Sequence, residues 1–125
     1  MIIGIGTDIL QIERLQAAYD RTQGRLAEKI LGPDEMLVFK HRFARNHKRD
    51  IAFLATRFAA KEALYKALSP SHGLQWHEAE VINQPNGKPE FLFRGEIADL
   101  VDGAQVHLSL SHDAGIASAM VVLER

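Results

Sequence analysis

The chain has 125 residues and a formal net charge of −1 at pH 7. This length suits one domain of modest stability, and the near-zero charge excludes a global electrostatic attraction to nucleic acid or to membranes. The chain contains no cysteine, which excludes disulfide and thiolate chemistry and agrees with a reducing compartment. We therefore expect a single cytoplasmic domain over residues 1–125, without a signal peptide or a membrane span.

The first half of the chain is predicted to hold one strand and several helices. Residues 1–10 form an Ile-rich apolar run, typical of a strand that is central in its sheet or buried on both faces. Helices are expected over residues 12–19, 25–31 and 33–42. Pro33 suits the first turn of the third of these helices. Asp50 is predicted to cap a long helix that ends at Ser69-Pro70.

The second half is predicted to be mainly strands. Residues 79–84 and 91–94 flank a turn at 85–89, and residues 95–101 form a short helix. Apolar and polar residues alternate over 106–111, and after a turn at 112–115 a run through Val122 returns as the hairpin partner. The expected class is therefore α+β, with an antiparallel sheet packed against one long helix and several shorter ones.

Glu62 lies on the apolar stripe of the long helix. At about 100° per residue it falls within about 20° of the centre of that stripe. The stripe contains Ile51, Leu54, Ala55, Phe58 and Tyr65. A carboxylate in such a place must be paired, hydrogen-bonded or bound to a cation. The simplest alternative is an i,i+4 salt bridge with Lys66 on the surface.

Asp8 is the second candidate acid, at the end of the N-terminal apolar run. Gly4 and Gly6 remove side chains from one face of this strand, so that another element can approach closely. Asp8 could therefore meet Glu62, although a turn or capping role would also explain it. Two inward carboxylates with lysines alongside suit Mg²⁺, which prefers few carboxylates, several waters and substrate phosphates.

Four segments, taken in order over nearly the whole chain, resemble a known family. They are Gly4-Ile5-Gly6-Thr7-Asp8-Ile9 with Arg14, Arg57-Phe58-Ala59-Ala60-Lys61-Glu62-Ala63 with Lys66-Ala67, Asn86-Gly87-Lys88-Pro89, and Leu110-Ser111-His112-Asp113. The chain resembles the holo-acyl-carrier-protein synthases, the small bacterial type of 4'-phosphopantetheinyl transferase. The resemblance implies that family's fold and the transfer of 4'-phosphopantetheine from coenzyme A to a serine of apo acyl carrier protein. It also implies release of adenosine 3',5'-bisphosphate, a role in fatty acid biosynthesis, and a homotrimer with active sites between subunits.

The resemblance also implies roles for individual residues. Asp8 and Glu62 would bind Mg²⁺ against the pyrophosphate, Lys66 would neutralise the phosphates, and Lys61 would assist or pair with an acid. The catalytic set is Asp8, Glu62, Lys66 and His112. Either a metal-bound water or Glu62 would take the serine proton, with His112 contacting phosphate or assisting. Asp113 is a possible auxiliary metal ligand.

Binding residues follow from the same motifs. Those expected to contact coenzyme A are Arg57, Lys61, Lys66, Gly87, Lys88, Pro89 and His112. The guanidinium of Arg57 suits the 3'-phosphate. Those expected to bind the acidic carrier protein are Arg14, Arg21 and Arg25. Arg45, Lys48 and Arg49 either add to this patch or are merely solvated. The segment 69–73 departs from the family's usual glycine-rich loop, so no contact is inferred from it.

Two other functions are compatible with the same residues. A Mg²⁺-dependent pyrophosphate hydrolase acting on a nucleotide such as coenzyme A would use the same acids, with water in place of serine. A non-enzymatic module could bind a nucleotide or an acidic partner through the basic residues. Such a module would avoid acids beside its phosphate site, so the presence of both Asp8 and Glu62 disfavours it.

Overall fold

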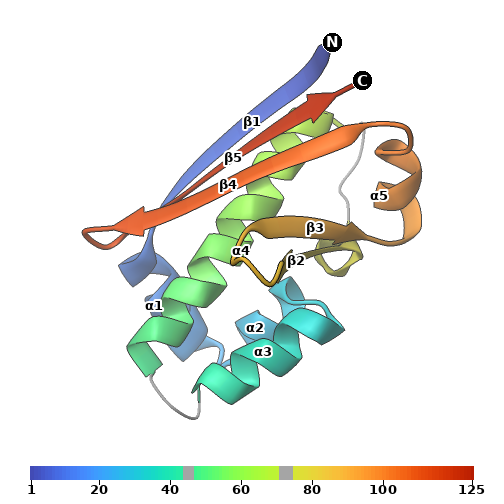
Figure 1. Cartoon of the computed structure of the whole chain (residues 1–125). Coiled ribbons are helices and arrows are strands. Elements are labelled where there is room, and N and C mark those ends of the chain that lie inside the picture. The colour runs from blue at the N-terminus through green and yellow to red at the C-terminus, as the bar shows by residue number, and fades with distance from the viewer. Residues whose placement is uncertain (44–46, 71–74) are drawn as a thin grey trace.

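The computed structural model describes residues 1–43, 47–70 and 75–125 (Figure 1). In chain order its elements are β1 (Ile2–Gln11), α1 (Ile12–Arg21), α2 (Arg25–Ile30), α3 (Pro33–Phe43), α4 (His47–Leu68), the 3-10 helix η1 (Trp76–Glu78), β2 (Ala79–Asn83), β3 (Pro89–Phe93), α5 (Gly95–Leu100), β4 (Gln105–Asp113) and β5 (Ile116–Glu124). The α+β class and the order of the elements agree with the expectation from sequence. Among the described residues, no helix is both long and apolar enough to cross a membrane.

The main sheet is antiparallel and three-stranded, in the order β1-β5-β4, and β2 and β3 form a separate two-stranded sheet. α4 lies across one face of the main sheet, while α1, α2 and α3 gather around its N-terminal half (Figure 1). The two termini lie side by side at the far end of the sheet, where the Arg125 amide donates to the Met1 carbonyl at 2.9 Å.

α4 approaches β1 and β5 closely because the facing residues are small. Gly4 and Gly6 face the helix, and a Cβ on either would overlap a main-chain carbonyl oxygen, that of Ala67 or Ala63. The predicted use of these two glycines for close approach is therefore confirmed. Buried alanines of α4 pack in the same core as small and branched residues of β5. This close contact lets side chains at the flank of the helix reach the backbone of β1.

Two predictions about elements are wrong. β1 is an edge strand, and the central strand is β5. One face of β1 packs on α4, but the other exposes Ile3, Ile5 and Ile9 at 46%, 57% and 74%. An Ile-rich run shows that both faces are apolar, not what covers the second face. The long helix begins at His47, so Asp50 lies buried within its first turn rather than at an N-cap.

Candidate active site

Asp8, Glu62 and Lys66 come together where α4 crosses β1; we call this group the acidic site. Lys66 Nζ donates to the Thr7 carbonyl at 2.9 Å and to Asp8 Oδ1 at 3.2 Å. The Asp8 side chain is only 15% exposed, whereas that of Lys66 is 54% exposed. Glu62 lies one helical turn before Lys66 and is partly buried. The predicted meeting of β1 with the Glu62 face of the helix is thus observed.

Electrostatics in the acidic site favour a cation. Burial raises the pKa of Glu62, the charge of Asp8 raises it further, and Lys66 opposes both effects. The two carboxylates therefore repel each other, and a bound cation would relieve that repulsion. Among the described residues, no group of three or more His, Asp or Glu side chains is arranged to hold a metal ion. A pair of carboxylates suits an ion such as Mg²⁺, which takes its remaining ligands from water and substrate.

A second group of predicted residues lines a cavity of about 400 Å³, which we call the Arg57 cavity. Its lining residues are Arg42, Ala52, Phe53, Thr56, Arg57, Asn83, Gly87, Pro89, Leu110, Ser111 and His112. Four of the predicted coenzyme A contacts are among them, namely Arg57, Gly87, Pro89 and His112. Lys88 is exposed in the same turn, outside the lining.

The Arg57 guanidinium is fixed in the wall of this cavity. Its carbon lies 3.9 Å from the centre of the Phe53 ring, Nη1 donates to Thr56 Oγ1 at 3.1 Å, and Nη2 donates to Asn83 Oδ1 at 3.4 Å. Only 8% of the residue is exposed. Burial lowers the pKa of Arg57 to about 10, so the group is still a cation at neutral pH. The cavity therefore presents a pre-positioned positive charge, which suits an anionic ligand.

α4 separates the acidic site from the Arg57 cavity. The acidic site lies at β1, one edge of the sheet, whereas the cavity includes residues of β4, the other edge. Arg57 and Glu62 are five positions apart, which corresponds to about 140° around a helix. Between the two sites, buried alanines of α4 pack against the central strand β5. Within one chain, His112 and Arg57 are therefore not brought together with Asp8 and Glu62.

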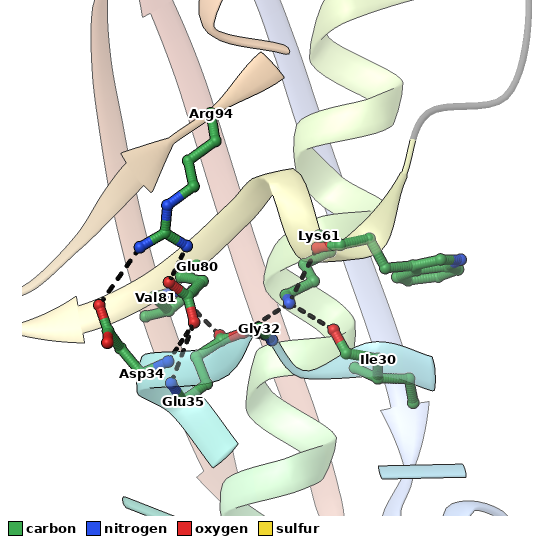
Figure 2. A network of polar contacts seen from close by, with 9 residues as sticks. Ile30, Gly32, Asp34, Glu35, Lys61, Glu80, Val81 and Arg94 are labelled. Carbon is green, nitrogen blue, oxygen red and sulfur yellow. Dashed lines mark hydrogen bonds and ion pairs between the residues drawn. The ribbon is translucent and has the colours of Figure 1, made fainter. Parts of the chain in front are cut away.

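Lys61 does not face a ligand site, which corrects its predicted contact with coenzyme A. Its ammonium is fully buried, 2.6 Å from Glu35 Oε1, and also donates to the carbonyls of Ile30 and Trp76 at 2.5 and 3.1 Å (Figure 2). The alternative that Lys61 pairs with an acid is confirmed. Lys61 immediately precedes Glu62 in the sequence, but one helix position turns its side chain by about 100°, away from Glu62 and into the core.

The Lys61 pair belongs to a larger buried network that joins four elements. Glu35 Oε1 also accepts from the Gly32 amide, and Glu35 Oε2 accepts from the Val81 amide at 2.8 Å. Glu80 of β2 accepts from the Asp34 and Glu35 amides at the start of α3, and its other oxygen accepts from Arg94 (Figure 2). These bonds tie α3, α4, β2 and the segment after α2 together.

The remaining predicted residues have simple placements. Arg14, Arg21 and Arg25 are exposed on α1 and at the start of α2, beyond the end of β1 that carries Asp8. Asp113 is wrong as an auxiliary ligand within one chain, because the strand register places it on the sheet face opposite Asp8. Arg45, the side chains of Lys48 and Arg49, and most of the segment 69–73 lie outside the described residues.

Sequence reasoning missed several residues that shape these sites. Phe53, Thr56 and Asn83 surround Arg57, and Glu35 neutralises Lys61. Phe53 and Thr56 precede Arg57 by four and one positions on the same helix, so helical spacing could have suggested a contact for Phe53. Asn83 and Glu35 come from other elements, and no local pattern points to them.

Comparison with known proteins agrees with this geometry. The model of the 4'-phosphopantetheinyl transferase superfamily matches residues 4–119, and the chain belongs to that family. Within it, the chain is similar to the holo-[acyl-carrier-protein] synthase of Polynucleobacter asymbioticus, with 59% identity over 98% of both chains.

Solved structures extend the likeness. The holo-[acyl-carrier-protein] synthase of Neisseria meningitidis shares 32% identity with a TM-score of 0.89 and full coverage of both chains. The synthase of Bacillus anthracis, solved in complex with CoA (3',5'-ADP), shares 37% identity with a TM-score of 0.81, covering 99% of this chain and 97% of that one. The particular proteins that this chain resembles are therefore holo-acyl-carrier-protein synthases.

Proposed function

We propose that the protein is a holo-acyl-carrier-protein synthase. It transfers 4'-phosphopantetheine from coenzyme A to a serine of apo acyl carrier protein and releases adenosine 3',5'-bisphosphate. The observation that carries this proposal is the acidic site, in which the charges of Asp8, Glu62 and Lys66 act on one another in a chain from this family. We further propose that it acts in the cytoplasm and supports fatty acid biosynthesis.

The residues of the acidic site suit attack of a hydroxyl on a pyrophosphate. In this reaction the serine oxygen bonds to the β-phosphorus, the bond from that phosphorus to the bridging oxygen breaks, and the serine proton passes to a base. Asp8 and Glu62 would hold Mg²⁺, which neutralises charge on the phosphate oxygens when bound. Lys66 adds a second positive charge at the same place. Because Lys66 carries this positive charge beside Asp8, its substitution should weaken phosphate binding.

The Arg57 cavity would bind the nucleotide end of coenzyme A. The fixed guanidinium suits the 3'-phosphate, and His112 and the turn around Gly87 line the same cavity. The acidic site and this cavity lie on opposite sides of α4, so one chain does not present both to one coenzyme A molecule. We therefore propose that a complete active site combines the acidic site of one protomer with the Arg57 cavity of its neighbour.

The exposed face of the sheet supports the corresponding assembly. Ile3, Ile5 and Ile9 of β1 and Met120 of β5 are between 45% and 74% exposed on the face away from α4. Apolar side chains at this density on one sheet face favour burial against another copy. Contacts between two different surfaces close into a ring when the rotation between copies permits it, and the proposed assembly is a homotrimer.

The acceptor protein would dock on the basic side chains of α1 and α2. Arg14, Arg21 and Arg25 are exposed there, and acyl carrier proteins are acidic. Attraction between exposed charges weakens with salt. The Michaelis constant for the carrier protein should therefore rise with ionic strength, and a constant that does not change with salt would remove the electrostatic argument for this surface.

The transfer is tested directly by the intact mass of apo acyl carrier protein after incubation with the protein, coenzyme A and Mg²⁺. A gain of one phosphopantetheine arm, about 340 Da, is expected, and it should disappear with Asp8→Ala, Glu62→Ala or a chelator. Asp99→Ala, an exposed acid on α5, is the matched control and should keep the gain. No gain with intact coenzyme A would favour a binding module, and cleavage of coenzyme A without carrier protein would favour a hydrolase.

Shared active sites are tested by mixing two inactive variants. Asp8→Ala removes the acidic site, and Arg57→Ala removes the cavity charge. If sites form between protomers, random mixed trimers at equal ratio should regain about a quarter of the sites. Activity that stays at the level of the separate variants after unfolding and refolding together would show that each site lies within one chain.

A further inference from the structure

Arg57 is a buried cation whose partners are all neutral. Among the residues that the structure describes, no carboxylate lies within ion-pair distance of its guanidinium. Its hydrogen bonds go to the Thr56 hydroxyl and the Asn83 carboxamide, and its flat face lies on Phe53. Nε is buried and has no hydrogen-bond partner. Buried cations are normally paired with acids, so this arrangement leaves an uncompensated positive charge.

Glu35, the acid that acts on the pKa of Arg57, does not compensate the positive charge of Arg57. Glu35 raises the pKa of Arg57, but its Oε1 atom lies 2.6 Å from Lys61 and its Oε2 atom accepts from Val81. Arg42, which lines the same cavity, lowers the pKa of Arg57 and so adds positive potential. The charge of Glu35 is thus largely balanced by Lys61, and the Arg57 cavity stays electropositive.

Asn83 lies where the charge of its own side chain affects how strongly the positive charge of Arg57 attracts a ligand. Its side-chain oxygen lies 3.4 Å from Arg57 Nη2, and the residue is exposed at the end of β2 and lines the cavity. Aspartate is nearly isosteric with asparagine. A carboxylate at this position would pair with the guanidinium in the geometry already present and would repel an incoming phosphate.

We propose that Asn83 is a specificity-determining residue: as a neutral acceptor it holds the Arg57 guanidinium in place without neutralising it, which reserves the full charge for a dianionic phosphate monoester on the nucleotide. This inference rests on the proposed binding of the coenzyme A nucleotide in the Arg57 cavity. Asn83 acts through Arg57, so it is a positioning residue rather than a catalytic one. The discrimination it sets is between nucleotides with and without the 3'-phosphate.

The test compares two nucleotides that differ in this phosphate, adenosine 3',5'-bisphosphate and AMP. Their dissociation constants are measured by calorimetry on the full chain, for the wild type, Asn83→Asp and Asn83→Ser. The wild type should bind the bisphosphate more tightly than AMP. Asn83→Asp should reduce this ratio by about 10- to 100-fold, the range of a charge-assisted hydrogen bond. Asn83→Ser, which is neutral, should keep the ratio within about threefold.

The ratio separates a charge effect from structural damage. A variant that merely loosens the cavity would weaken both nucleotides alike and leave the ratio unchanged, and that result for Asn83→Asp would overturn the proposal. An equal loss of the ratio in Asn83→Ser would also overturn it, because the carboxamide contact rather than its neutrality would then matter. Melting curves of the three proteins confirm that each is folded, as expected for an exposed position.

The same proteins separate this inference from the proposed function. With coenzyme A and 3'-dephospho-coenzyme A as donors to apo acyl carrier protein, Asn83→Asp should raise the Michaelis constant for coenzyme A selectively, with little change in kcat. Transfer activity in which Asn83→Asp keeps the wild-type preference for coenzyme A over 3'-dephospho-coenzyme A would support the synthase and refute the role of Asn83. If Asn83→Asp changes nucleotide binding as predicted but the wild type does not modify carrier protein, the role of Asn83 would be supported and the proposed synthase activity refuted.

Discussion

Replacing Lys61 by methionine should strongly destabilise the protein, although Lys61 contacts no ligand. The substitution keeps the length of the side chain and removes the ammonium. Glu35, of which only 1% is exposed, would then keep its charge with only the Gly32 and Val81 amides as partners. The carbonyls of Ile30 and Trp76 would also lose their shared donor. Burial already lowers the pKa of Lys61, and Glu35 is what opposes that shift.

Removing one member of such a buried pair typically costs about 3–5 kcal/mol. Domains of this size are stable by only about 5–15 kcal/mol, and 1 kcal/mol corresponds to about 4 °C in melting temperature. Lys61→Met should therefore lower the melting temperature by more than about 10 °C. The exposed Lys29, changed to methionine, is the matched control and should stay within about 0.5 kcal/mol of the wild type.

A double-mutant cycle with Glu35→Gln isolates the pair. Glutamine keeps an acceptor oxygen for the Gly32 and Val81 amides but carries no charge, so it does not need the ammonium. The double variant should be more stable than the sum of the single losses predicts, by about 1–3 kcal/mol. Urea unfolding measures each free energy, with an unchanged m-value as the check on two-state behaviour. A loss below about 1 kcal/mol for Lys61→Met would refute the reasoning, since Glu35 would then be solvated or protonated without cost.

Other predictions follow from the close helix contact, the acidic site and the sheet face. Gly6→Ala places a Cβ against the main-chain carbonyl of Ala63. It should lower the free energy of unfolding by about 3 kcal/mol and remove most of the activity. Wild-type stability in urea would contradict the close contact. Glu62→Gln should abolish transfer yet stabilise the metal-free protein at pH 7 by less than about 1 kcal/mol, because the raised pKa means that the folded state penalises the ionised form. This gain in stability should vanish below the pKa of free glutamate, because Glu62 is then protonated in the folded and the unfolded state. Melting curves at pH 3.5 and 7, roughly either side of the ordinary glutamate pKa, measure the gain. Ile5→Lys should convert the proposed trimer to monomers in light scattering and remove activity without unfolding the chain; an unchanged mass would show that this face is not the interface.

Local patterns in the sequence are enough to predict most of the secondary structure. Periodicity and turn residues place the helices and strands to within a few residues, because a helix stripe and a strand alternation are properties of neighbours in the chain. The same patterns single out Asp8 and Glu62, since an acid at an apolar position needs a partner wherever the chain folds. The resemblance to a known family then connects these acids with Mg²⁺ and phosphate chemistry.

Long-range packing decides what those patterns leave open. Lys61 and Glu62 are neighbours in one motif, yet one faces Glu35 in the core and the other faces Asp8, because the rotation of α4 on the sheet is set by the contacts of its alanines. The partners of Arg57 come partly from β2, which no local signal links to α4. The edge position of β1 and the separation of the acidic site from the Arg57 cavity depend on strand order. Strand order arises from contacts between residues far apart in the chain, and the tertiary structure alone determines it.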